Sequence, residues 1–260
     1  MKKYGVKFWS RNILDTPEII EDISRKTKEG IFDFVEIFAY KDTFERTAQK
    51  LYPLFKDVHV NIHASHGSFG FNTALKENFI ENQKQFNEAQ KFADLFKSEI
   101  IVTHPGYEGN ESLLEETIRQ FNLFKDNRLT VENLPHVSDN NDKYSFFQGS
   151  SPESISAIMS ETKCKFCLDF SHAICAANSL KIEPFEILKN FENLSPNVYH
   201  ICDGTFEKKY DEHLHIGAGD YPLKSIIENY SAKNAMLTLE TGVYPSVPDW
   251  EDDIRKLKDF

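Results

Sequence analysis

The best candidates for a functional site in this sequence are histidines and acidic residues that follow short apolar runs. They occur in the phrases NIHAS, VTHPG, LTVEN, LDFSH and VYHICD. Imidazole and carboxylate groups bind zinc, manganese or iron, and a bridging carboxylate allows more than one ion. A single such histidine is more often a surface or core residue, but several of them with separate carboxylates indicate a metal site. The candidate ligands are His63, His104, Glu132, Asp169, His172, His200, Asp211, His213 and Glu240.

The elements that must position these ligands repeat about eight times, as a short apolar run followed by a longer amphipathic stretch. Runs rich in Val, Ile and Phe that end at Gly, Pro, Ser or Asn are typical of buried parallel strands. A chain of 260 residues is long enough for eight such repeats in one domain. We therefore predict an α/β fold, a single (β/α)8 TIM barrel over residues 1–260.

The predicted strands cover residues 4–9, 33–38, 58–63, 99–104, 128–132, 164–169, 198–202 and 236–240. The predicted helices cover residues 17–28, 43–52, 76–97, 112–125, 152–160, 184–191, 222–230 and 249–258. In such a barrel the loops that follow the strands carry the chemistry, so a polar residue at a strand end is informative.

Glu132 and Glu240 each end an apolar strand, in LTVE and LTLE. A buried carboxylate without a partner is costly, and metal coordination removes that cost. The structural alternative is a salt bridge to a lysine or arginine, but neither neighbouring strand end supplies an obvious one. Asp169 and His172 can converge if the chain turns from strand into loop between them.

Composition and charge restrict the class of protein. The net charge of −11 argues against a general nucleic-acid-binding surface, because phosphate backbones are bound by lysine and arginine. Bound divalent cations would offset part of that charge locally. No apolar run has the length of a signal peptide or a membrane span, so we expect a cytoplasmic protein. Cys164 and Cys167 would point to opposite faces of one strand, which predicts small core residues rather than a redox pair.

Together, the phrases IHAS, THPG, VEN, LDFSHA, YHICD, DEHLHIGAG and LETGVYP resemble those of endonuclease IV. The chain is thus similar, from about residue 58 to 245, to the xylose isomerase-like TIM-barrel superfamily, or AP endonuclease family 2. The resemblance implies up to three zinc ions. It implies a first zinc on His63, His104 and Glu132, a second on Glu132, Asp169, His200 and Glu240, and a third on His172, Asp211 and His213.

The activity that this resemblance implies is phosphoester hydrolysis, with abasic-site DNA as one substrate. Paired zinc ions lower the pKa of bound water and a third ion stabilises the leaving oxygen, so no protein nucleophile is required. Three departures count against DNA, and the first is the loop after the second strand, which reads AYKDTFER where the family has a polar, arginine-bearing loop that inserts into the DNA minor groove. The bridging glutamate is followed by NLPHVSDN instead of a small loop with Gly and Gln, and Glu212 stands where the family usually has an arginine.

A sugar or sugar-phosphate isomerase or epimerase of the same superfamily is the alternative. It would hold one manganese, magnesium or cobalt ion on Glu132, Asp169, His200 and Glu240, and the two glutamates would move a proton between adjacent carbons. His172 would then contact a sugar hydroxyl. The four additional ligands favour the hydrolase, and the acidic composition favours the isomerase. A third hypothesis is a metal-stabilised binding protein without catalysis.

Overall fold

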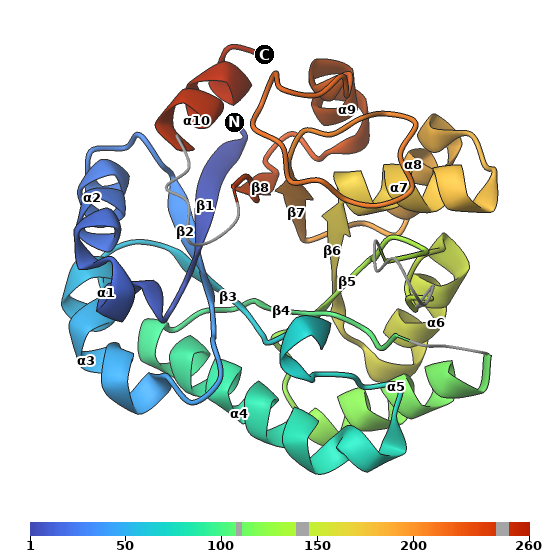
Figure 1. Cartoon of the computed structure of the whole chain (residues 1–260), viewed down its shortest axis with the longest axis horizontal. Coiled ribbons are helices and arrows are strands. Elements are labelled where there is room, and N and C mark those ends of the chain that lie inside the picture. The colour runs from blue at the N-terminus through green and yellow to red at the C-terminus, as the bar shows by residue number, and fades with distance from the viewer. Residues whose placement is uncertain (108–110, 139–145, 243–249) are drawn as a thin grey trace.

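Eight parallel strands form a closed barrel, and helices surround it as an outer ring (Figure 1). The computed structural model describes residues 1–107, 111–138, 146–242 and 250–260, apart from the side chains of 111–113. Because β8 pairs with β1, the sheet has no free edge. The predicted (β/α)8 barrel is therefore confirmed.

The strands of the barrel are short and lie in regular order along the chain. They are β1 (Lys3–Trp9), β2 (Phe34–Phe38), β3 (Val60–His63), β4 (Ile101–Thr103), β5 (Leu129–Glu132), β6 (Lys165–Asp169), β7 (Val198–Ile201) and β8 (Met236–Leu239). The helices are α1 (Asn12–Asp15), α2 (Pro17–Lys28), α3 (Phe44–Phe55), α4 (Phe79–Phe96), α5 (Glu111–Phe124), α6 (Pro152–Thr162), α7 (Phe170–Leu180), α8 (Pro184–Glu192), α9 (Leu223–Tyr230) and α10 (Trp250–Lys258). Two short 3-10 helices are η1 (Gly67–Phe69) and η2 (Lys76–Asn78).

All eight predicted strands are present, with ends that differ by no more than two residues from the prediction. Helices α1 and α7 were not predicted. In α7 the residues from Phe170 to Ala177 are all buried, so the segment lacks the alternation of apolar and polar residues that reveals a surface helix. Position 249, the predicted start of the last helix, lies outside the described residues.

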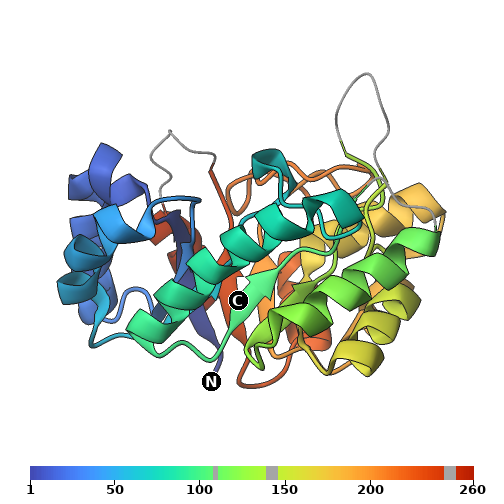
Figure 2. The same ribbon diagram turned by 90° about the horizontal axis from the view of Figure 1, so that it is seen from below.

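Figure 2 shows the barrel from the side. Successive side chains of a strand point alternately outward, into the apolar core under the helices, and inward, into the barrel interior. In β2, Val35 and Ile37 belong to the main core between strands and helices. Glu36 lies between them and faces inward, where it contacts a side chain of β7 across the barrel. The same alternation places His63 of β3, Glu132 of β5, Asp169 of β6 and His200 of β7 inside the barrel, since their neighbours Ile62, Val131, Leu168 and Tyr199 belong to the main core.

The cysteines follow the same rule. Cys164 belongs to the main core, whereas Cys167 belongs to a small inner apolar cluster with Ile100, Val102 and Val198. The two thus lie on opposite faces, as predicted, and all four cysteines of the chain are buried and free. Within the described residues, no helix is both long and apolar enough to cross a membrane.

Candidate metal centre

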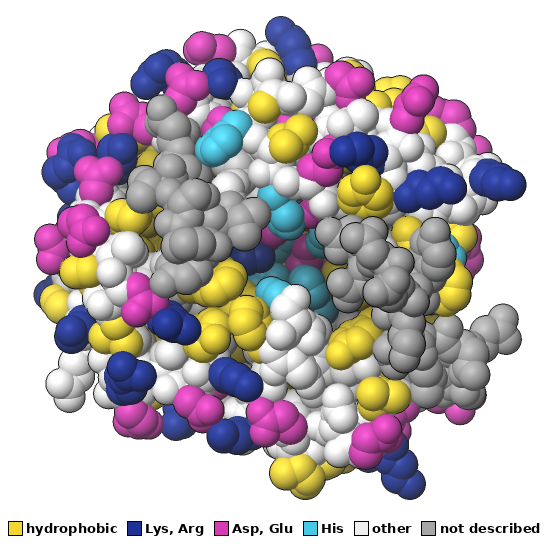
Figure 3. All heavy atoms as spheres, viewed as in Figure 1, with side chains coloured by type: hydrophobic (Ala, Val, Ile, Leu, Met, Phe, Trp, Pro, Cys, Tyr) yellow, Lys and Arg dark blue, Asp and Glu magenta, His cyan; other side chains and the backbone are white. Residues whose placement is uncertain are grey.

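The mouth of the barrel at the carboxyl ends of the strands gathers all nine candidate ligands. Figure 3 shows histidine and acidic side chains at the base of a central hollow, with most lysines and arginines toward the periphery. His63, Glu132 and Asp169 are the last residues of β3, β5 and β6, while His104 and Glu240 directly follow β4 and β8. His200 pairs with Asp169 in the sheet register, so these two side chains enter the interior at one level.

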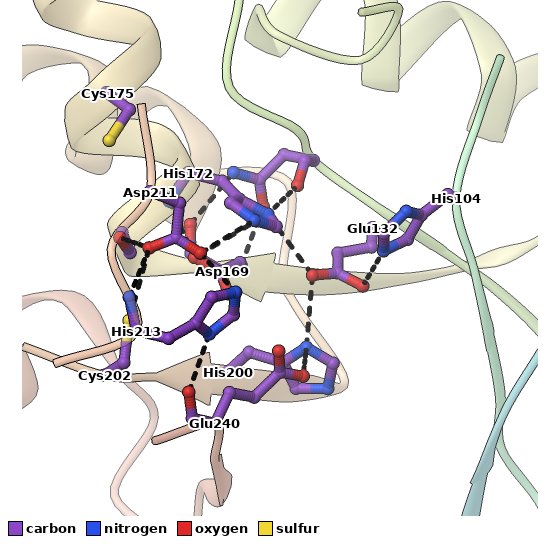
Figure 4. A network of polar contacts seen from close by, with 12 residues as sticks. His104, Glu132, Asp169, His172, Cys175, His200, Cys202, Asp211, His213 and Glu240 are labelled. Atoms are coloured by element: carbon purple, nitrogen blue, oxygen red, sulfur yellow. Dashed lines mark hydrogen bonds and ion pairs between the residues drawn. The ribbon is translucent and has the colours of Figure 1, made fainter. Parts of the chain in front are cut away.

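Glu132 is the centre of this cluster (Figure 4). Its Oε2 atom lies 3.2 Å from His63 Nε2 and 3.1 Å from His104 Nε2. Its Oε1 atom lies 3.3 Å from His172 Nδ1 and 3.1 Å from His200 Nδ1. The two oxygens of one buried carboxylate therefore face different imidazoles, with His63 and His104 at Oε2 and His200 at Oε1, an arrangement that suits a group shared by two metal ions.

Backbone carbonyls fix the orientation of three of the imidazoles. The Nδ1 atom lies 2.7 Å from Ala64 O in His63 and 2.7 Å from Glu240 O in His213. In His172 the same atom lies 2.9 Å from Asn133 O. Because a carbonyl only accepts hydrogen bonds, Nδ1 carries a proton and donates, so Nε2 is the atom of each ring that would bind a metal ion.

Asp211 and His213 belong to the loop between β7 and α9. Asp211 Oδ2 lies 2.7 Å from His213 Nε2 and 3.6 Å from His172 Nε2. A pair of backbone hydrogen bonds between Asp203 and Leu214, each 3.0 Å long, ties this loop to the end of β7. The three side chains that the resemblance assigns to a third zinc are thus neighbours.

The contact between Asp169 and His172 differs from the expectation. The chain does not turn into a loop after β6 but enters α7 at once, with Asp169 as its N-cap. Asp169 Oδ1 accepts a hydrogen bond of 2.7 Å from the backbone N–H of His172, which lies in the first helical turn. The helix start, rather than a loop, therefore brings the two side chains together.

The second oxygen of Asp169 indicates that the residues fit a cation. Asp169 Oδ2 is buried and has no hydrogen-bond partner, an arrangement that is costly for a carboxylate. Burial, reinforced by the nearby carboxylates of Glu132 and Asp211, raises the pKa of Asp169 to about 7. A divalent ion among these oxygens and imidazole nitrogens would satisfy the free atom and keep the carboxylate ionised.

Burial lowers the pKa of His172, but the carboxylates of Asp169, Asp211 and Glu132 raise it well above its usual value, so a metal ion would displace a proton there. Electrostatics favour the metal-binding forms of Glu132 and His104. Burial opposes the ionised form of Glu132, but the surrounding imidazoles, led by His200 and His104, hold the pKa of this carboxyl well below its usual value. Burial also lowers the pKa of His104 to about 4. Glu132 is therefore ionised and His104 neutral near pH 7, which are their metal-binding forms.

The expectation that neighbouring strand ends supply no lysine or arginine is wrong for Glu240. Lys7 Nζ lies 2.6 Å from Glu240 Oε1, and both side chains are mostly buried. Lys7 sits in the middle of β1, which becomes a neighbour of Glu240 only because β1 pairs with β8. For Glu240 the salt-bridge alternative thus holds in this structure, alongside a 2.7 Å contact from the same oxygen to His200 Nδ1.

Glu36 is a second residue of the site that the sequence patterns did not identify. Its carboxylate oxygens lie 3.0 and 3.2 Å from His200 Nε2, and it also accepts a 3.0 Å hydrogen bond from Thr238 Oγ1. His200 Nε2 therefore donates to Glu36 while Nδ1 faces the metal cluster, as in other carboxylate-oriented histidine ligands. The sequence does contain a pattern that could have identified it, because Glu36 is a lone acidic residue inside the apolar strand FVEIF.

Comparisons with known proteins agree with this architecture. A D-tagatose 3-epimerase-like protein is 20% identical, with a TM-score of 0.73 over 99% of this chain and 96% of its own. Endonuclease IV from Thermus thermophilus is 20% identical, with a TM-score of 0.68 over 99% and 97%. A putative xylose isomerase from Rhodospirillum rubrum is 11% identical, with a TM-score of 0.77 over 100% and 99%. At these identities the likeness establishes the fold alone.

A search of curated proteins finds no match. The family model described as xylose isomerase-like TIM barrel matches residues 25–260, which is most of the sequence. That range includes every candidate ligand and Glu36, whereas Lys7 precedes it. The chain belongs to the xylose isomerase-like TIM barrel family.

Proposed function

We propose that this protein is a metal-dependent phosphoester hydrolase with up to three zinc ions at the barrel mouth. The observation that carries the proposal is the position of Glu132. Its Oε2 faces His63 and His104 and its Oε1 faces His200, at 3.1 to 3.2 Å, which suits a carboxylate shared between two ions rather than bound to one. The neighbouring group of His172, Asp211 and His213 adds donors for a third ion.

In this proposal each part of the chain has a separate task. Zinc ions would supply a water of lowered pKa and stabilise the leaving oxygen. Glu132 would be shared by the two central ions, and His63 and His104 would complete the ligands of one of them. The backbone carbonyls that accept from Nδ1 of His63, His172 and His213 keep these rings aimed at the cluster.

A sugar or sugar-phosphate isomerase or epimerase is the second candidate, and it has an observation in its favour. His200 Nδ1 lies 3.1 Å from Glu132 Oε1 and 2.7 Å from Glu240 Oε1, so two glutamates flank one imidazole. With Asp169, these residues would hold a single manganese, magnesium or cobalt ion. Glu132 and Glu240 would then carry a proton between adjacent substrate carbons, and His172 would contact a hydroxyl group.

The ratio of metal ions to protein chains separates the two candidates. Elemental mass spectrometry of freshly purified protein, prepared without chelators, should find close to three zinc ions per chain for the hydrolase. A single manganese, magnesium or cobalt ion would instead support the isomerase. Hydrolysis of small phosphoesters and of abasic-site DNA would be measured in the first case, and isomerisation of ketoses and their phosphates in the second.

The variant His213→Ala tests the third position. It should remove about one zinc ion per chain and abolish phosphodiester hydrolysis while the barrel stays folded. His59→Ala is the matched control, because His59 is an exposed histidine that precedes β3 and lies at the opposite end of that strand from His63. Retention of most activity in His213→Ala would remove the third ion from the mechanism.

The buried, free cysteines support a reducing compartment, and we propose the cytoplasm as the location.

A further inference from the structure

A hollow of about 430 Å³ lies directly above the candidate ligands. Its base includes His104, His172, Asp211 and His213, which are four of the proposed ligands. The volume falls in the range of pockets that bind small molecules. A group bound in this hollow would therefore touch the metal centre at one end and the pocket walls at the other.

Aromatic rings form a large part of these walls. Tyr107, from the loop after β4, and Phe147, from the loop after β5, lie side by side with ring centroids 6.2 Å apart. The two residues also form an antiparallel bridge. Tyr210 contributes a further ring from the loop between β7 and α9.

Tyr107 is held firmly in place. The buried side chain of Asn72 accepts a 3.1 Å hydrogen bond from the Tyr107 N–H and donates a 3.2 Å bond to its carbonyl. On another side the ring lies against Gly67, where an added Cβ would be only 2.9 Å from Tyr107 Cε1. Such a preorganised ring can stack on a planar group without a large loss of side-chain entropy.

The described residues that line the hollow include histidines but no lysine or arginine. Lys208, which lies over the Tyr210 ring, forms an ion pair with Glu212. A strand of nucleic acid needs basic side chains along its phosphates, whereas an uncharged ring needs an apolar wall.

We propose that the hollow binds the organic part of a small phosphoester, a single uncharged planar ring, with Tyr107 and Phe147 as its contact surface. This inference rests on the proposed function and specifies its substrate class. The phosphate would reach the ligand cluster at the base while the ring stacks against the wall. Among the described lining residues, a nucleic-acid strand would find no lysine or arginine for its flanking phosphates.

Binding of two phosphonates tests this proposal without requiring turnover. Calorimetry on the zinc-loaded protein would compare phenylphosphonate with methylphosphonate, which share the anionic group and differ in the ring. Aromatic stacking predicts that phenylphosphonate binds about tenfold more tightly. Equal affinities, or no binding of either compound, would overturn the proposal, as would tighter binding of a short abasic-site duplex than of phenylphosphonate.

Variants of the wall residues test which side chains cause the preference for the phenyl compound. Tyr107→Ala and, independently, Phe147→Ala should remove most of the preference for the phenyl compound, while Tyr107→Phe should keep it. Tyr52→Ala is the control, because Tyr52 is 43% exposed on α3 and does not line the hollow. A preference that survives both alanine variants would contradict the assignment. If the ring preference is found but no phosphoester is hydrolysed, the hydrolase proposal fails and the pocket proposal stands.

Discussion

The ends of β5 and β8 carry nearly the same sequence, LTVE and LTLE, yet the two glutamates have different surroundings. Glu132, at the end of β5, faces imidazole nitrogens of His63, His104, His172 and His200. Glu240, after β8, faces one histidine and the ammonium group of Lys7. One carboxylate is thus surrounded by groups that bind metals when neutral, and the other is already paired with a fixed cation.

This difference follows from the positions of the strands in the closed barrel. β5 lies between β4, which His104 follows, and β6, which leads into α7 with His172, whereas β8 lies between β7, which carries His200, and β1, which supplies Lys7. A lysine cannot act as a metal ligand while protonated, so it provides charge without coordination. We infer that the negative charge of Glu132 depends on metal ions for its neutralisation far more than that of Glu240 does.

Glu132→Gln should have the largest effect, because it removes the carboxylate that both central ions would share in the proposed centre. We expect the loss of about two zinc ions per chain and a fall in kcat/KM of more than about 100-fold, the upper end of the effect of outer-shell partners. Elemental analysis and steady-state kinetics would measure the two losses. Unchanged zinc content in this variant would exclude Glu132 as the bridge.

Glu240→Gln should have the next largest effect on metal binding, since it removes one proposed ligand of one ion. About one ion per chain should be lost, while the position formed with His63 and His104 keeps its ligands. The same variant distinguishes the two activities. In an isomerase it should stop exchange of a substrate carbon-bound proton with solvent, and absence of such exchange in the wild-type protein would count against that activity.

The sequence predicted the barrel and the ligand phrases because both depend on local patterns. Apolar runs that end in a histidine or an acid are visible in the sequence, and the alternation of strand residues places them inside. Lys7 and α7 were harder to predict. The pairing of Lys7 with Glu240 requires β1 to meet β8 at a given register, and the fully buried α7 has no amphipathic pattern.

Lys7→Met should affect the metal-free protein most. Loss of the ammonium would leave Glu240 buried without its 2.6 Å partner, and breaking such a pair costs about 3 kcal/mol at the low end of the usual range. Urea denaturation of chelator-treated protein would measure the loss in the free energy of unfolding. Lys3→Met is the control, since Lys3 is exposed on the same strand.

Zinc should reduce the difference between Lys7→Met and the wild-type protein, because an ion beside Glu240 would replace the missing positive charge. An equal loss with and without zinc would mean that Lys7 acts through packing alone. No loss in either state would contradict the view that the ion pair compensates Glu240.

Glu36→Gln should have the smallest effect of this series, because Glu36 acts through His200 rather than on the metal. Glutamine retains an oxygen that can accept from His200 Nε2, but it lacks the charge that strengthens this donor. We expect zinc affinity at the His200 position to fall about 10-fold, the lower end for an orienting carboxylate, with little change in the number of ions at saturation. Competition with a chromogenic chelator would measure the affinity, and Glu99→Gln, at an exposed glutamate, is the control. If Glu36→Ala and Glu36→Gln lower the affinity equally, the hydrogen bond to His200 does not contribute to zinc affinity. Glu36 would then act only through its negative charge, which offsets the positive charge of Lys7.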